Sequence, residues 1–196
     1  MGFWGWFWLI VIGVVVYSIV VARNQANKAK EQGSALAAIP DFKSAVVFKG
    51  AYGGAGVAID AERDKFAISY GANNTKVFGF ADLVAVEVLR NGSSVHKTNR
   101  GSQVAGAAVG AVLLGPVGLL LGGLTGSKRS VEKVDRLSLK IFTNDLVNPV
   151  HEIVFFNIPK SKPDSLLVKQ ASQELDAWFG RFQTILHMRE RPSHVG

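Results

Sequence analysis

The chain of 196 residues contains no cysteine, which excludes disulfide bonds, thiolate catalysis and cysteine-based metal centres. No serine lies in a nucleophile-elbow context, and no Gly-Lys-Ser/Thr phosphate loop joins a strand to a helix. Its histidines show no metal-ligand spacing with one another or with carboxylates: His96, His151, His187 and His194. We therefore expect no enzymatic activity, no metal, no cofactor and no small-molecule substrate.

Charge is also scarce, since only 19% of the residues are charged and 48% are hydrophobic. This composition is too apolar for a disordered protein, and the length fits one ordinary domain plus membrane segments. Two long runs, 3–22 and 104–125, carry no charge at all. They decide most of what can be predicted about location.

Residues 3–22 read FWGWFWLIVIGVVVYSIVVA, which as a helix reaches about 30 Å, the thickness of one hydrocarbon core. This predicts a transmembrane helix. Aromatic rings that favour the headgroup region cluster at its first end: Phe3, Trp4, Trp6, Phe7 and Trp8. A cleaved signal peptide is the alternative, although the run is long for one and no basic residue precedes it.

The basic stretch RNQANKAK follows the apolar run directly, so the positive-inside rule predicts an outside N-terminus and a cytoplasmic remainder. We interpret residues 23–43 as a linker, because Gly33-Ser34 and Pro40 interrupt a short polar stretch that is capable of forming a helix. Such a linker would let the next domain stand off the membrane.

From residue 44 the pattern changes to short strands at 45–49, 56–60, 65–70, 76–80, 83–92, 134–145 and 147–157, with a further one possible after the Asn91-Gly92 turn. The first connection, GAYGGAG, is expected to be a flexible hairpin loop. Asp60, Glu62 and Asp64 surround the next turn, where we expect a solvated hairpin tip.

A closing helix is predicted with Pro163 or Asp164 in its first turn and Ser161 or Asp164 as its cap. Apolar residues recur along it at spacings of three and four: Leu167, Ala171, Leu175, Trp178, Phe179, Phe182, Ile185 and Leu186. A partner helix or a membrane surface would bury this face, but packing on the chain's own sheet is the simpler prediction.

Antiparallel strands followed by one capping helix are the element order of a pleckstrin-homology-like (PH-like) domain. The segments GVAIDAERDKFAIS and KVFGFADLVAVEVLRNG resemble the PH-like domains of small bacterial membrane proteins. The resemblance implies an α+β fold, a PH-like antiparallel β-barrel or sandwich over residues 44–188, followed by a tail at 189–196. It also implies a binding module in the bacterial inner membrane. Inositol-phosphate binding is not implied, because the first hairpin carries only Lys49.

The second apolar run lies in an insert at 101–126, which interrupts this domain. Gly115 and Pro116 near its midpoint predict two half-helices joined in a hairpin. Glycines recur every four residues within each half, which favours close helix packing: Gly106 and Gly110, then Gly118, Gly122 and Gly126. The hairpin either dips into the membrane, crosses it, or packs against protein.

Basic residues flank the insert on both sides and contribute net charges of +3 over 90–100 and +2 over 128–136. Because the segment between them is apolar, these flanks suit an anionic membrane surface better than nucleic acid. The candidate surface residues are Arg90, Lys97, Arg100, Lys128, Arg129, Lys133 and Arg136.

Two functional hypotheses follow. The first is a non-enzymatic membrane-anchored scaffold, whose domain binds a protein partner or the lipid surface and whose glycine stripes allow a homo-oligomer. The second is a protein of the superinfection-exclusion type, which prophages encode to stop incoming phage DNA at the inner membrane.

Overall fold

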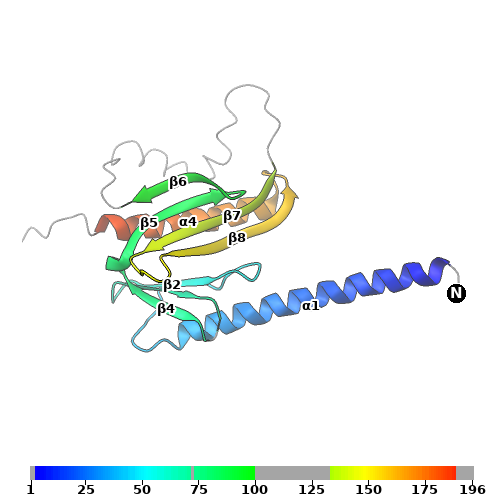
Figure 1. Cartoon of the computed structure of the whole chain (residues 1–196), viewed down its shortest axis with the longest axis horizontal. Coiled ribbons are helices and arrows are strands. Elements are labelled where there is room, and N and C mark those ends of the chain that lie inside the picture. The colour runs from blue at the N-terminus through cyan, green and yellow to red at the C-terminus, as the bar shows by residue number, and fades with distance from the viewer. Residues whose placement is uncertain (1–2, 72, 100–132, 189–196) are drawn as a thin grey trace, which may run out of the picture.

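The computed structural model describes residues 3–71, 73–99 and 133–188 (Figure 1). A long helix, α1 (Phe3–Ala37), extends from a domain that ends in the helix α4 (Leu166–Met188). Between them lie β1 (Val46–Phe48), β2 (Gly56–Asp60), β3 (Lys65–Ser69), β4 (Thr75–Gly79), a 3-10 turn η1 (Phe80–Asp82), β5 (Leu83–Arg90), β6 (Ser93–Asn99), β7 (Val134–Thr143) and β8 (Val150–Ser161). The predicted α+β class is confirmed.

The strands form two antiparallel sheets rather than one closed barrel. Sheet A has the order β1-β2-β3-β4, and sheet B has the order β6-β5-β7-β8. The alternation of apolar residues sets the inner faces. Of the two architectures predicted, the fold is therefore the sandwich.

The core lies between the two sheets and α4. Phe66 of β3 stacks on Phe78 at 5.2 Å between ring centroids and meets Phe182 of α4 edge-on at 5.5 Å. Trp178 and Phe182 are almost completely buried. The apolar face of α4 thus packs against the chain's own sheets, as expected.

The start of α4 differs in detail from the sequence prediction. Val168 is 3% exposed and joins the core, whereas Leu167 is 57% exposed. Ser165, and neither Ser161 nor Asp164, caps the helix: its hydroxyl accepts the Val168 N–H at 3.4 Å, and its carbonyl accepts the Lys169 N–H at 3.0 Å.

The connection from β6 to β7 contains the insert, and its two ends are held at opposite ends of sheet B. Asn99 pairs with Ala85 near the start of β5, whereas Val134 lies three residues before Leu137, the partner of Arg90. At 3.3 Å per residue these points are separated by about 26 Å along the strand direction. The predicted hairpin turn at Gly115 and Pro116 and the glycine stripe of Gly106, Gly110, Gly118, Gly122 and Gly126 lie outside the described residues.

Candidate functional site: the junction between the membrane helix and the domain

The first part of α1 is apolar and packs against nothing in the described chain. Trp4 is 73% exposed, and Trp6, Phe7 and Trp8 are also exposed. Among the described residues this is the one helix long and apolar enough to span a membrane. Exposing so much contiguous apolar surface to water is unfavourable, which favours a lipid environment.

The helix does not end where the apolar run ends. It continues to Ala37, through Gly33 and Ser34, so the predicted linker at 23–43 is helical over its first part. The Ser34 hydroxyl donates to the Lys30 carbonyl at 3.0 Å and needs no break in the helix. The helix ends shortly before Pro40, because the residue before a proline disfavours helical backbone.

The last turns of α1 dock on the outer face of sheet A. Leu36, only 1% exposed, packs on Ala58 and Ala67, with Ile39 and Phe42 beside it. The two alanines are register partners on β2 and β3. Their short side chains let the helix approach the sheet closely. The domain therefore packs directly against α1 and is not connected to it through a flexible linker alone.

A polar contact joins the same helix to the glycine-rich loop between β1 and β2. The Gln32 side-chain amide, in a residue only 3% exposed, donates to the Gly54 carbonyl at 2.8 Å. Gly50 has a φ of +77°, and a β-carbon there would lie 2.6 Å from Gln32 Oε1. The loop that we expected to be a flexible hairpin loop is therefore a contact surface for α1.

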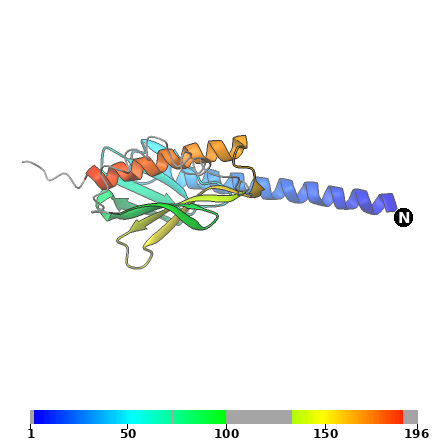
Figure 2. The ribbon, with the colours of Figure 1, turned by 90° about the horizontal axis from the view of Figure 1, so that it is seen from above.

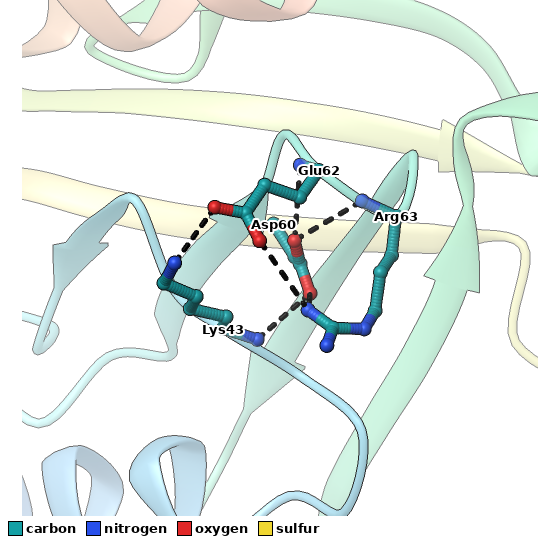
Figure 3. A network of polar contacts seen from close by, with 4 residues as sticks. All are labelled: Lys43, Asp60, Glu62 and Arg63. Atoms are coloured by element: carbon teal, nitrogen blue, oxygen red, sulfur yellow. Dashed lines mark hydrogen bonds and ion pairs between the residues drawn. The ribbon is translucent and has the colours of Figure 1, made fainter.

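The segment that follows α1 is fastened by Asp60, at the end of β2 (Figure 3). Its carboxylate accepts the Lys43 N–H at 2.7 Å, the N–H groups of Glu62 and Arg63 at 3.1 and 3.2 Å, and the Arg63 guanidinium at 3.3 Å. Burial alone would raise the pKa of Asp60, but these donors outweigh it and lower that pKa below its usual value. The prediction of a solvated tip was wrong for Asp60, which is fully buried.

Comparison with known proteins identifies the family of this chain. The family model described as "Glycine zipper containing PH domain" matches residues 45–157, more than half of the 196 residues. The chain belongs to this family. The predicted resemblance to PH-like domains is confirmed.

Two relatives match nearly the whole chain at 24% identity, each covering 91% of it. One is the SPbeta prophage-derived uncharacterized membrane protein YomJ of Bacillus subtilis (strain 168), of which 83% is covered. The other is the "Immunity protein" of Bacillus phage SPbeta, of which 94% is covered. No solved structure matches. Membrane association agrees with the first name and with α1.

The described part of the predicted basic surface of this glycine-zipper PH domain is not confined to one end of sheet B. We call the end where β7 begins and β8 ends the proximal end, because it points along α1 toward the helix N-terminus in both views (Figures 1 and 2). Lys133 and Arg136 lie there, next to Arg90. Lys97 lies further toward the opposite, distal end, and Arg100, Lys128 and Arg129 fall outside the described residues.

Several of these cations interact with the domain itself. Arg136 pairs with Glu152 at 3.2 Å, and the Lys97 ammonium lies over the Phe142 ring at 5.2 Å. Lys97 is also the register partner of Glu87 in sheet B. Among the described flanking residues, Arg90, Lys133 and Arg136 therefore lie together at the proximal end, and Lys97 lies apart from them.

Asn91 stabilises the glycine-zipper PH domain through its side chain, whereas the sequence predicted only that it lies in a turn. Its side-chain oxygen accepts the N–H groups of Asp135 and Arg136 at 2.8 and 3.2 Å, and its amide donates to the Lys133 carbonyl at 2.9 Å. It thus fixes the point where the chain re-enters the sheet after the insert. Only the positive φ of a turn residue was predictable.

His151 is the second residue whose role was missed. It is 1% exposed, its Nδ1 lies 2.8 Å from the Tyr70 hydroxyl, and its Nε2 lies 3.5 Å from the Thr143 hydroxyl. Burial, with a smaller contribution from the nearby Lys76 ammonium, lowers the pKa of His151. The histidine is a core residue that links β7 and β8 of sheet B to Tyr70, which follows β3 of sheet A.

Proposed function

We propose that the protein is a non-enzymatic, membrane-anchored binding protein whose PH-like domain is held rigidly at the membrane surface. The docking of α1 carries this proposal. Its apolar part is exposed, while its last turns are buried on Ala58 and Ala67, so one continuous helix links bilayer and domain.

The proposed location is the bacterial inner membrane, with one crossing, the N-terminus outside and the domain in the cytoplasm. Arg23, Lys28 and Lys30 follow the apolar run directly. These positive charges support the orientation through the positive-inside rule.

A second candidate function, superinfection exclusion, is favoured by the names of the two relatives, one an immunity protein of a phage and the other a prophage-derived membrane protein. In this version the glycine stripe of the insert assembles copies in the membrane, where they block entry of phage DNA. The insert then acts through self-association or by dipping into the bilayer.

Orientation is tested in a chain that has no cysteine background. Single cysteines replace Gly2, Ser94, Ser130 or Ser193, and intact cells are treated with a membrane-impermeant maleimide. We expect the Gly2 position to react in intact cells and the other three only after lysis. Labelling of Ser130 and Ser193, but not Ser94, in intact cells would mean that the insert crosses the membrane and would overturn the single-domain topology.

The role of the insert is tested with a replacement of the same length, so that the connection that spans about 26 Å between Asn99 and Val134 keeps its number of residues. Residues 104–125 are replaced by an equally long Gly-Ser segment, and cells are challenged with phage. Exclusion predicts that the native chain lets phage adsorb but not inject DNA, and that the replacement loses this protection at equal membrane levels. A native chain that gives no protection would reject the second candidate, and equal protection by both would remove the insert from the mechanism.

A further inference from the structure

The proximal end of the domain exposes leucines where a core helix would normally hide them. Leu166 and Leu167, in the first turn of α4, are 69% and 57% exposed, and Ile158 near the end of β8 is 37% exposed. The next residue, Val168, is buried in the core. The helix is therefore in its packed position, and the two leucines point away from the core.

Exposed lysines lie on the segments that adjoin these apolar residues, and one exposed acid, Asp164, lies between Lys162 and α4. Lys160 and Lys162 lie in the segment that leads into α4, and both are exposed. Lys133 is exposed as well and precedes Val134, the register partner of Ser161. Asp135 accepts the backbone N–H of Lys160, which fixes that segment, and the Lys160 residue is exposed.

The position of this patch relative to α1 identifies its occupant. Docking of α1 begins near Ala29, which is about 10 Å of helix beyond Ala22, the end of the apolar run. The proximal end and the start of α4 project back along α1 in the direction of its N-terminus in both views (Figures 1 and 2). If α1 spans the bilayer, this end of the domain lies at the headgroup layer.

We infer that the patch formed by Leu166, Leu167, Ile158, Lys133, Lys160 and Lys162 is a second membrane contact, which inserts leucines into the interface of an anionic bilayer beside α1. Exposed apolar residues ringed by lysine are the composition of interfacial membrane contacts. The inference rests on the proposed membrane anchoring and deepens it, because it names the lipid surface that the domain binds.

The test uses the full chain in vesicles, with Leu167→Cys carrying an environment-sensitive fluorophore and doxyl-labelled lipids as quencher. The matched control is Leu146→Cys, on the loop between β7 and β8 at the distal end, where the native side chain is 99% exposed. We expect the probe at position 167 to lose most of its fluorescence in vesicles containing phosphatidylglycerol, and the probe at position 146 to lose none.

Charge reversal provides the second arm. Each lysine near an anionic surface changes the equilibrium constant for binding of the patch to the bilayer about fivefold. The double variant Lys160→Glu and Lys162→Glu is therefore expected to lower this constant by roughly 25-fold or more. Quenching at position 167 then disappears, as it does in vesicles of phosphatidylcholine alone.

Flotation of the same vesicles separates the two proposals. A chain that does not float with lipid refutes the membrane anchor itself. A chain that floats, but whose probes at positions 167 and 146 are equally water-exposed, overturns only the second contact. If the fluorophore at position 167 is shielded from water in a way that depends on protein concentration and persists in detergent, a second copy of the chain covers the patch. That result would also overturn the inference.

Discussion

Replacing Leu36 by alanine measures directly how strongly α1 is docked. The change removes the equivalent of three buried methylene groups from a side chain that is 1% exposed. At about 0.8 kcal/mol for each group, the lost transfer energy is about 2.4 kcal/mol. The neighbouring Ala58 and Ala67 are too small to refill the space, so a cavity cost adds to this and brings the total to about 3 kcal/mol.

For a domain of this size, 1 kcal/mol shifts the melting temperature by about 2 to 4 °C, so Leu36→Ala is expected to lower it by about 6 to 12 °C. The assay is thermal unfolding of the full chain in detergent, followed by circular dichroism of the sheets. The control is Leu146→Ala, which removes the same atoms from a side chain that is 99% exposed and is expected to change nothing. Equal melting temperatures for the two variants would refute the docking of α1 as a stabilising contact.

Three further predictions concern the residues around this junction and the core. Gly50→Ala places a β-carbon 2.6 Å from the Gln32 side chain, whereas Gly53 has a similar φ and open space around it. Backbone strain is expected to lower the free energy of unfolding of both variants by about 1 to 2 kcal/mol. Because only Gly50→Ala adds a steric clash, chemical denaturation is expected to show a clearly larger loss of stability for it than for Gly53→Ala. Because burial lowers the pKa of His151 in the folded chain, the unfolded chain binds more protons than the folded chain below pH 6.5. The melting temperature is therefore expected to fall between pH 7 and pH 5. The same measurement on His151→Phe is expected to show a smaller fall. Asn91→Gly keeps the positive φ of the turn but loses three hydrogen bonds, so hydrogen exchange at the Asp135 and Arg136 amides should accelerate at least about tenfold, and unchanged exchange would contradict the role of Asn91.

The strands were predictable because their side chains alternate and their turns carry recognisable residues. The strand predicted over 56–60 is observed at those positions, and the Asn91-Gly92 turn has the positive φ angles that its residues favour. The face of α4 was also predictable apart from its first turn. In that turn, either Leu167 or Val168 fits the three- and four-residue spacing of buried residues. Only the tertiary packing determines that Val168 is the buried one.

The junction was not predictable for a different reason. A Gly-Ser pair usually weakens a helix, but here tertiary contacts of Gln32 and Leu36 on either side of it hold the helix together. Likewise, Asp60 in a charged turn suggests solvent exposure, and only the arrival of Lys43 from a distant segment shows why it is buried. Contacts between segments far apart in the chain leave no local pattern.

A rigid link between the membrane helix and the domain is tested most directly by a distance measurement. Spin labels are placed at Lys28→Cys on α1 and Asn73→Cys beyond β3, both exposed positions, in the full chain reconstituted in lipid nanodiscs. A docked helix predicts one narrow distance distribution in pulsed electron resonance, which broadens in the Leu36→Ala background. A broad distribution in the native chain, indistinguishable from that of a chain with a flexible Gly-Ser insertion after Gln32, would show that the domain hangs freely from its anchor.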